Sequence, residues 1–354
     1  MDTHDPEINQ TFSCPLPLRE YPHVILAHGS GGKLSHQLIK ELFLNGFRNR
    51  YLEPLHDGAV IDLQNVSFAF TTDSYVVDPV FFPGGDIGNL SVNGTVNDLA
   101  MCGAKPLWIS AAFIIEEGFS MNDLASIVGS MKAAAERAGV VIVTGDTKVV
   151  DKGKGDKIFI TTSGVGLVDR RTPISPANAK PGDKIIVSGN IAVHGIAIMS
   201  IREGLRFETE VKSDTAPLND IVASILTVSK KVHVLRDPTR GGIASALNEI
   251  AESSHAGINL DQTIIPLPPD VSSACELLGL DPLYVANEGI FLAIVAPEDA
   301  GKIVSCMRGH ALGTRAEIIG EVVRDHPGVV VMKTTIGGTR VVDMLSGEQL
   351  PRIC

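Results

Sequence analysis

Aromatic residues are scarce in this chain: Phe, Tyr and Trp together make up 5% of its 354 residues. Apolar residues nevertheless amount to 44%, so the hydrophobic cores must be built from Val, Ile, Leu and Ala. Such cores are typical of sheets whose faces are covered by helices. The apolar content also argues against a chain that is disordered throughout. The length by itself predicts two domains.

Basic runs and long apolar runs are also missing. The chain has 30 Lys and Arg against 41 Asp and Glu, a formal net charge of −11. An acidic chain without a basic stretch is a poor binder of phosphate backbones or anionic membrane surfaces, so neither nucleic acid nor membrane is an expected partner. No stretch approaches the roughly 18 consecutive apolar residues of a membrane span. Nucleotide binding stays possible, because glycines, Mg²⁺ and one or two lysines hold small phosphates.

The cysteines are few and scattered. None of the five forms a C-x-x-C pair, which argues against a zinc cluster or a disulfide framework and favours a reducing compartment. Residues 1–22 contain no apolar segment of the kind found in signal peptides, so we expect a cytoplasmic protein. The five are Cys14, Cys102, Cys275, Cys306 and Cys354.

Composition changes along the chain predict a mixed α/β (α+β) architecture in two lobes. The segment "DRRTPISPANAKPGD" has three prolines and no apolar periodicity, and is interpreted as the domain boundary. We expect an N-terminal extension (1–22), an N-terminal domain (23–170), a C-terminal α/β domain (171–336) and a mobile tail (337–354). Gly337 and Gly338 are the predicted hinge of that tail, whose 18 residues could span roughly 60 Å when extended.

Local patterns predict the elements of the N-terminal domain. Leu34, Leu38 and Leu42 recur every four residues and indicate a helix. A further helix is expected over 121–139. The expected strands are 66–75, 106–117, 140–149 and 156–166.

A glycine-rich loop precedes the first of these helices. Backbone N–H groups of such a loop, together with a helix N-terminus, form an anion site, and a lysine adds a point charge. The spacing is not that of a P-loop, and a flexible turn explains the loop equally well. The loop consists of Gly29, Ser30, Gly31, Gly32 and Lys33.

Several aspartates are expected at strand mouths or in turns. Hard oxygen ligands of this kind suit Mg²⁺ bound together with nucleotide phosphates. Each could also be an ordinary capping or turn residue, and the sequence alone does not show that they converge. They are Asp57, Asp73, Asp98, Asp146 and Asp237.

Four other residues are candidates for the chemistry. Lys148 and Glu288 each adjoin an apolar strand, where desolvation could make the lysine a base and where an ionised Glu288 would need no desolvation. His194 begins a predicted helix. Cys354 is a terminal thiol on the predicted mobile tail. Ordinary structural or surface roles would explain each of these residues taken alone.

Taken together, the motifs identify a family. "AHGSGGK", "FTTDSYVVDPVFFPGGDIG", "GTVNDLAMCGA", "TGDTKVV", "DPTRGG", "ANEG" and the ending "PRIC" occur in this order from Val24 to Cys354. This order resembles the HypE hydrogenase-maturation proteins, which are similar in fold to aminoimidazole-ribonucleotide synthetase and selenophosphate synthetase.

The resemblance implies an ATP- and Mg²⁺-dependent carbamoyl dehydratase. A HypF carbamoyltransferase would carbamoylate the thiol of Cys354, and the protein would dehydrate the S-carboxamide to a thiocyanate. The cyano group would then pass to iron on a HypC–HypD complex for [NiFe]-hydrogenase maturation. A homodimer is also implied, in which the two N-terminal lobes share a barrel.

The resemblance also assigns residues. The phosphate site is placed at Gly29, Ser30, Gly31, Gly32, Lys33, Asp73, Thr95, Asn97 and Asp98. Mg²⁺ is placed at Asp57, Asp73, Asp98 and Asp237. Cys354 is the modified residue, Asp146 and His194 line the carboxamide site, and either Lys148 or Glu288 is the base.

Two alternatives remain. One keeps the fold for a small-molecule kinase such as thiamine-monophosphate kinase, whose turnover would survive deletion of the tail. The other is a non-catalytic scaffold that binds nucleotide only to order its tail for a partner.

Overall fold

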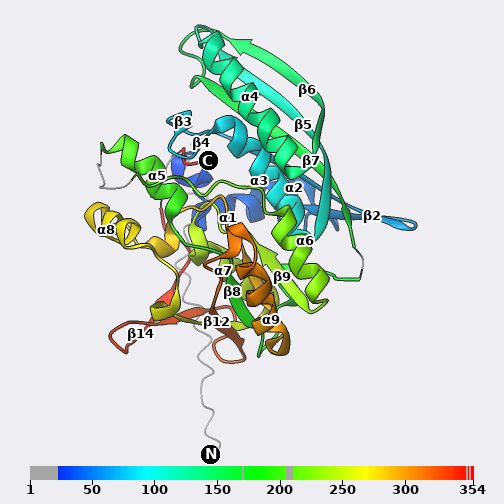
Figure 1. Ribbon diagram of the computed structural model, residues 1–354, viewed down its shortest axis with the longest axis vertical. Helices are drawn as coiled ribbons and strands as arrows, with labels where there is room; N and C mark the ends of the chain where they lie inside the picture. Colours follow the sequence, from blue (N-terminus) through cyan, green and yellow to red (C-terminus); the bar gives the residue numbers. More distant parts are fainter. Residues whose placement is uncertain (1–22, 170, 205–209, 348–349, 351) are drawn as a thin grey trace, which may run out of the picture.

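The computed structural model describes residues 23–354 except 170, 205–209, 348–349 and 351. The N-terminal extension predicted for residues 1–22 lies outside the described residues. Two large sheets, one in each half of the chain, organise the molecule (Figure 1). This is the mixed α/β arrangement in two lobes that the sequence predicts.

The N-terminal sheet has the strand order β1-β2-β7-β5-β6. All neighbours are antiparallel except β5 and β6, which run parallel. The predicted strands are confirmed to within about two residues at either end. The strands are β1 (Ala59–Leu63), β2 (Val66–Tyr75), β5 (Ala104–Glu116), β6 (Val141–Val150) and β7 (Ile158–Val168).

Helices α3 (Ile87–Met101) and α4 (Met121–Ala138) cover one face of this sheet. The other face carries exposed apolar side chains, among them Phe70, Trp108 and Leu167. Strand β6 lies at the sheet edge, and nearly all of its residues are exposed. Exposed apolar side chains thus gather on the open face and at the edge of this sheet.

Helix α3 is not among the predicted elements, and Asp98 was predicted to lie at a strand mouth or in a turn. That placement is wrong, because Asp98 lies within α3. Thirteen of the fifteen residues of α3 are buried, so the helix has no polar face and no apolar stripe to detect. Gly94 is required inside it, since a Cβ there would lie 2.2 Å from the Tyr75 hydroxyl.

The segment before the first sheet is largely helical. A 3₁₀ turn, η2 (Leu26–Gly29), leads into the glycine loop. One continuous helical rod follows, as the leucine spacing predicts, and its parts are α1 (Lys33–Leu38), the π-helical η3 (Ile39–Leu44) and α2 (Asn45–Phe47). The short strands β3 (Phe81–Phe82) and β4 (Gly85–Asp86) precede α3.

The C-terminal sheet has the order β14-β13-β10-β12-β8-β11-β9. Its strands are β8 (Lys184–Val187), β9 (Val232–Arg236), β10 (Gly257–Asp261), β11 (Leu292–Val295), β12 (Glu317–Val323), β13 (Val330–Lys333) and β14 (Thr339–Val342). Short 3₁₀ turns lie between the elements: η4 (Pro176–Asn178), η5 (Gln262–Ile264), η6 (Pro282–Tyr284) and η7 (Ala311–Gly313).

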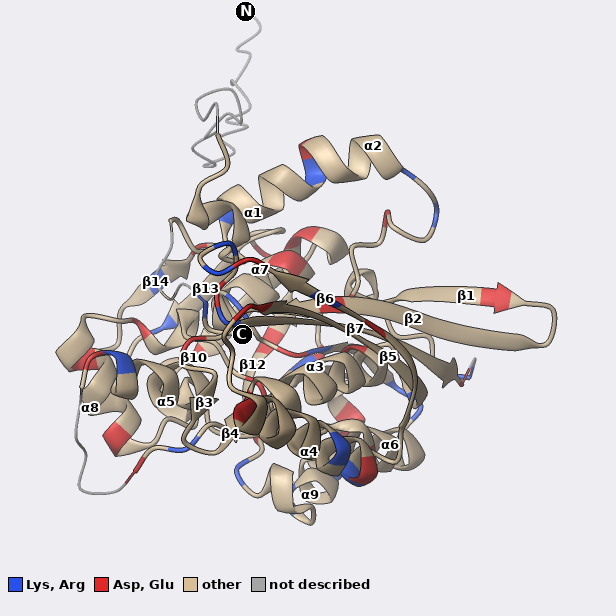
Figure 2. Cartoon of the chain, turned by 90° about the horizontal axis from the view of Figure 1, so that it is seen from above, with Lys and Arg blue, Asp and Glu red and all other residues tan. Residues whose placement is uncertain are grey.

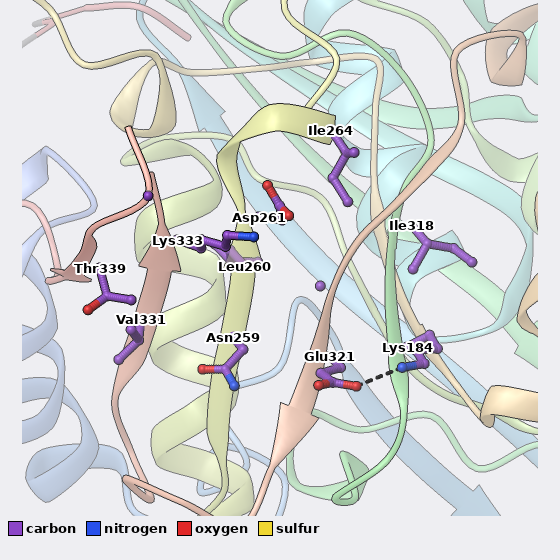
Figure 3. A pocket seen from close by; sticks show the side chains of 12 residues that line it. Lys184, Asn259, Leu260, Asp261, Ile264, Ile318, Glu321, Val331, Lys333 and Thr339 are labelled. Carbon is purple, nitrogen blue, oxygen red and sulfur yellow. Dashed lines mark hydrogen bonds and ion pairs between the residues drawn. The ribbon is translucent and has the colours of Figure 1, made fainter. Parts of the chain in front are cut away.

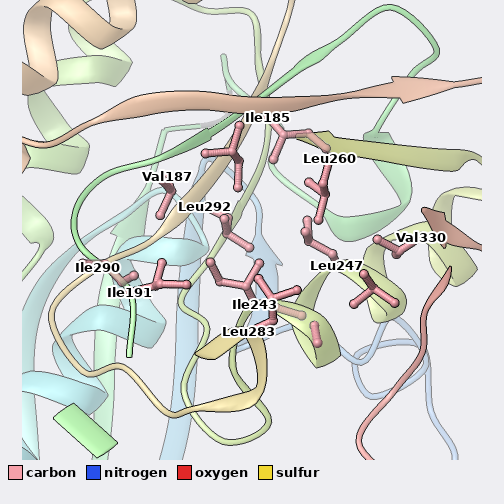
Figure 4. Close-up of a cluster of buried hydrophobic side chains, with 14 of the residues drawn as sticks. Ile185, Val187, Ile191, Ile243, Leu247, Leu260, Leu283, Ile290, Leu292 and Val330 are labelled. Carbon is pink, nitrogen blue, oxygen red and sulfur yellow. The ribbon is translucent and has the colours of Figure 1, made fainter. Parts of the chain in front are cut away.

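Helices pack on both faces of the centre of this sheet. Ile185 and Val187 of β8 point into a core with α5 (Val193–Arg202), α7 (Gly242–Ser254) and α8 (Pro269–Leu278) (Figure 4). Ile186 points to the opposite core, with α6 (Asn219–Val228) and α9 (Pro297–Arg308). Burial on both faces explains why these strands read as unbroken apolar runs.

The segment expected to be a mobile tail begins differently from the prediction. Gly337 and Gly338 form the turn of a hairpin, in which the N–H of Gly337 donates to the Thr334 carbonyl. Strand β14 then pairs antiparallel with β13. The two glycines are therefore not a hinge in this structure, because ladder hydrogen bonds hold the chain on both sides of them.

The chain then returns to the junction of the two domains. In both ribbon views the marked C-terminus lies over the body of the molecule (Figures 1 and 2). No helix of the described residues is both long and apolar enough to cross a membrane.

Candidate functional site

Three of the predicted aspartates converge at the junction of the domains. Ligand oxygens of Asp57, Asp98 and Asp237 all lie within 4.8 Å of one another. Asp57 precedes β1, Asp98 lies on α3, and Asp237 follows β9. The local fold holds two of them, since the Thr71 hydroxyl lies 2.7 Å from Oδ2 of Asp98 and 2.8 Å from the Asp57 carbonyl.

The carboxylates in this cluster repel one another in a buried setting. Burial and the charges of Asp237, Asp73 and Asp57 raise the pKa of Asp98 well above its ordinary value. Burial and Asp57 raise the pKa of Asp237 to about 8. Arg236 offsets part of this charge through an ion pair with Asp57 at 2.6 Å and one with Glu249. The cluster is thus short of positive charge.

These residues fit a hard divalent cation. Oδ2 of Asp57 is buried and has no hydrogen-bond partner among the described residues. An unsatisfied buried carboxylate oxygen beside two further carboxylates is a costly arrangement unless a cation binds there. Mg²⁺ takes ligands of this kind, usually with nucleotide phosphates completing its shell.

A cavity of about 770 Å³ opens beside the cluster. Asp57, Asp73, Asp98 and Asp237 line it, together with Arg240. Its volume is in the range of small-molecule and cofactor sites. The four aspartates predicted to bind Mg²⁺ and ATP are therefore brought to one cavity, and Asp73 lies near the end of β2.

The glycine loop packs against the returning C-terminal segment. The Lys33 N–H donates to the Leu345 carbonyl at 2.8 Å, and Nζ of Lys33 pairs with Asp343 at 2.5 Å. A Cβ on Gly32 would lie 2.3 Å from that same Leu345 carbonyl, and one on Gly31 would lie 2.7 Å from the Arg240 carbonyl. The loop therefore needs its glycines for close backbone approach.

The last three residues are docked between the domains. The Val76 N–H donates to the C-terminal carboxylate of Cys354 at 3.1 Å, and the Asp78 N–H donates to the Arg352 carbonyl at 3.2 Å. Ile353 is 2% exposed. Nε2 of His194 lies 2.8 Å from the Ile353 carbonyl. The tail thus runs antiparallel to the segment that follows β2 and is hydrogen-bonded to it.

His194 is a neutral imidazole in this setting. Its burial lowers its pKa to about 4. Because the Ile353 carbonyl can only accept, Nε2 carries the proton, and Nδ1 accepts from the Ser213 hydroxyl at 2.7 Å. His194 therefore contacts the tail backbone, whereas the prediction placed it at the carboxamide.

The Cys354 thiol lies among charged groups. It hydrogen-bonds with the Glu288 carboxyl group, and burial together with Glu288 and Asp73 raises the pKa of the thiol well above its ordinary value. The Arg240 guanidinium lies close by, and the interactions of Arg240 with Cys354, Asp73 and Glu288 raise its own pKa. The final thiol and an acid thus lie beside Arg240, a cation that lines the cavity.

Glu288 is more deeply buried than the sequence suggests. It is 3% exposed, its Oε1 has no partner among the described residues, and burial and Asp237 raise its pKa well above the ordinary value. An ionised Glu288 was expected to need no desolvation, but the carboxyl group is desolvated here and its burial favours the neutral form. Asp214 fixes its backbone by accepting from the N–H groups of Glu288 and Gly289 at 3.2 and 3.1 Å.

Lys148 and Asp146 are not brought to the thiol within this chain. Both lie on the exposed edge strand β6, where Nζ of Lys148 contacts both carboxylate oxygens of Asp146 at 2.7–2.8 Å. Thr95 and Asn97 lie inside the core: Thr95 bonds with Thr162 at 2.6 Å, and Asn97 donates to the Ala216 and Glu288 carbonyls. The roles assigned to these four residues stay predictions.

Sequence reasoning missed Arg240, Arg236 and Asp214. The two arginines were visible in the motif "LRDPTRGG", where their spacing around Asp237 was a usable signal. Asp214 follows a stretch without periodicity and offered none.

A separate hollow of about 520 Å³ lies on the open face of the C-terminal sheet (Figure 3). Strands β10, β12 and β13 contribute to it, and an ion pair of 2.6 Å joins Lys184 to Glu321 at its edge. It contains none of the aspartates described above.

Comparison with known proteins defines the class. Residues 55–168 match the N-terminal domain, and residues 180–333 the C-terminal domain, of the AIR synthase related proteins. Thiamine monophosphate kinase of Aquifex aeolicus shares the fold at 18% identity, with a TM-score of 0.64, and covers 88% of this chain and 99% of its own.

Within that class the likeness is specific. Carbamoyl dehydratase HypE of Cupriavidus necator is 56% identical over 93% of this chain and 94% of its own, and that of Escherichia coli is 42% identical over 94% and 99%. The chain belongs to the HypE family of carbamoyl dehydratases. A solved HypE–HypF complex matches with a TM-score of 0.83 at 49% identity, covering 87% and 99% of the two chains. A HypE structure in complex with ATP matches with a TM-score of 0.80 at 48% identity, covering 94% and 100%.

Proposed function

We propose that this protein dehydrates an S-carboxamide on its own Cys354 to a thiocyanate at the expense of ATP, supplying the cyanide ligand of [NiFe]-hydrogenase. The observation that carries the proposal is the meeting of the final thiol with Glu288 and Arg240 beside the aspartate cavity. The HypE relatives, one of them solved with ATP, support the same activity.

The reaction must expel an oxygen atom from the carboxamide. Transfer of the γ-phosphoryl group of ATP to the carbonyl oxygen converts it into a phosphate, which leaves readily. The C–O bond breaks, a C≡N bond forms, and two protons leave the nitrogen. The products are the thiocyanate, ADP and phosphate.

Asp57, Asp98 and Asp237 would hold Mg²⁺, with Asp73 beside them on the cavity wall. Bound there, Mg²⁺ would neutralise the phosphates and the crowded carboxylates. Gly31 packs against Arg240, which lines the cavity, so the glycine loop and Lys33 would cover the phosphates after Lys33 leaves Asp343. Arg240 is placed to stabilise negative charge on the carboxamide oxygen as it is phosphorylated.

Glu288 is the proposed base. Its pKa is held high partly by the charges of Asp237, Asp214 and Asp73, so neutralisation of the aspartate cluster favours its ionised form. It already contacts the thiol that carries the carboxamide. Lys148 remains the second candidate, because an exposed lysine in one chain could reach the site of another.

The exposed face of the N-terminal sheet supports a homodimer in which the two N-terminal lobes share a barrel. Trp108 is 49% exposed there, and the β6 edge carries Val141 and Val143 at 59% and 56%. Such surfaces are usually covered. HypF is a proposed partner because a HypE–HypF complex is known for a relative. A HypC–HypD complex as acceptor and a cytoplasmic location are proposed from the family resemblance.

The tail distinguishes this function from a small-molecule kinase and from a scaffold. When a HypF carbamoyltransferase, its carbamoyl donor and ATP are supplied, Cys354→Ala should abolish both carbamoylation and ATP-dependent cyanation, whereas Cys306→Ala on α9 should leave them unchanged. Mass spectrometry of the C-terminal peptide reads out the loss of water, about 18 Da per thiol. ADP release independent of Cys354 would support a kinase, and ATP binding without turnover would support a scaffold.

A further inference from the structure

The last arginine of the chain occupies a site built from both domains. Arg352 forms ion pairs with Asp156, in the loop between β6 and β7, and with Asp78 at 3.3 Å. Asp78 is paired in turn with Lys157 at 2.8 Å. Arg202, at the end of α5, donates to the carbonyls of Asp78 and Arg352.

The backbone conformation at Arg352 indicates that its side chain has a role in holding the tail. Its φ is +50°, in the left-handed region that glycine adopts freely and other residues rarely do. A glycine would suit the turn better, yet the position holds an arginine whose guanidinium reaches two carboxylates. The ion pairs compensate for an unfavourable backbone.

The carboxylates of Asp156 and Asp78 differ in their partners. Within the described residues its carboxylate contacts only the Arg352 guanidinium, whereas Asp78 is shared with Lys157 and lowered in pKa by it. Removal of Arg352 leaves Asp156 without a cation. The ion pair between Arg352 and Asp156 therefore joins the docked tail to the loop between β6 and β7.

We propose that Asp156 and Asp78 form a receptor for Arg352 that sets the position of the tail, so that Cys354 reaches Glu288. These are positioning residues. Arg352 lies two residues before the thiol, and the hydrogen bonds from Val76, Asp78 and His194 fix the register between them. Because the pairs are partly exposed, at 43% for Arg352 and 36% for Asp156, they can release the tail for modification and capture it again.

Accessibility of the thiol tests this receptor without any turnover. The full-length protein is treated with a maleimide, and modification of Cys354 is followed by the mass of the C-terminal peptide. Asp156→Asn should speed modification about fivefold, the effect of losing one partly exposed ion pair, and Arg352→Ala, which loses the pair with Asp78 as well, should speed it at least as much. Asp151→Asn, an exposed residue of the same loop, is the matched control and should react like the unaltered protein.

Two further measurements separate a specific pair from general loosening. Arg352→Ala combined with Asp156→Asn should react no faster than Arg352→Ala alone, because the second substitution removes a pair that is already lost. Raising salt from about 0.05 M to 1 M should speed modification of the unaltered protein but not of Arg352→Ala. Equal rates in all variants, or effects of the two substitutions that add in the double variant, would overturn the receptor.

The consequence for catalysis rests on the proposed function and is measured separately. In carbamoylated protein with ATP, the receptor variants should dehydrate the tail at least about fivefold more slowly, and the double variant should be no slower than Arg352→Ala. If the unaltered protein does not dehydrate its tail, the proposed function fails while the labelling result still decides the receptor. Protection lost without any slowing of dehydration would overturn the positioning role.

Discussion

At the domain junction, burial determines the chemical role of a single residue more than its residue type does. His194 begins a helix, and nothing in the sequence indicates that its ring is buried against the tail. Glu288 and Lys148 looked equivalent beside their strands, but one is buried and the other lies on an open edge. The aspartates were identifiable because each stands beside an apolar run. Their convergence was not, because it depends on the packing of α3 between the two domains.

His194 gives a pH prediction. Its pKa is about 4 in the folded protein and 6.5 ordinarily, so the unfolded chain binds the proton first as pH falls. Stability should therefore fall between pH 6.5 and 4, by up to about 3 kcal/mol from this residue. Chemical denaturation of the unaltered protein and of His194→Gln at pH 7, 5.5 and 4.5 checks this. An identical pH dependence in both would contradict it.

Glu288 gives a prediction about the base. Glu288→Gln keeps the size of the side chain but cannot accept the protons, so dehydration should slow at least about 100-fold while ATP binding is retained. Single-turnover mass spectrometry of the tail and ATP titration measure the two effects. Glu298→Gln, an exposed residue paired with Lys231, is the control. A full rate for Glu288→Gln would exclude it as the base and favour Lys148.

At the scale of elements, prediction succeeded where periodicity is clear. Apolar residues alternate along β2 and recur at helical spacing along α4. Helix α3 lacks such a pattern because it is buried nearly all round, and β14 was not predicted because the glycines before it suggested a hinge. The glycine loop was predicted to be a phosphate site, and its contact with the returning chain depends on residues over 300 positions away.

That contact can be tested at two neighbouring glycines. Gly32→Ala would place a methyl group 2.3 Å from the Leu345 carbonyl, whereas a Cβ on Gly29 meets nothing within 4 Å. Gly32→Ala should therefore lower the free energy of unfolding by about 1–3 kcal/mol and expose Cys354 to thiol reagents. Gly29→Ala should change neither stability nor thiol reactivity. Equal effects of the two substitutions would show that the loop and the tail segment do not pack in this way.

For the whole molecule, the charge and composition limited the class of partner, and the motif order identified the family. Neither determines the assembly. The exposed edge strand β6 offers a test of the proposed dimer. Val143→Lys places a charge on the proposed barrel surface, so it should convert a dimer into monomers. Analytical ultracentrifugation measures this, with Val128→Lys, an exposed valine on α4, as the control. A monomeric unaltered protein would contradict the shared barrel.

The central claim is that the docked thiol carries the substrate of an ATP-dependent dehydration. It is tested most directly by following the oxygen atom of a carboxamide labelled with ¹⁸O on Cys354 through one turnover with ATP. The account predicts that the tail peptide loses about 18 Da of unlabelled water, or about 20 Da with the label, and that the ¹⁸O is recovered in inorganic phosphate. Label that remains in the peptide, or that appears in water rather than in phosphate, would contradict it.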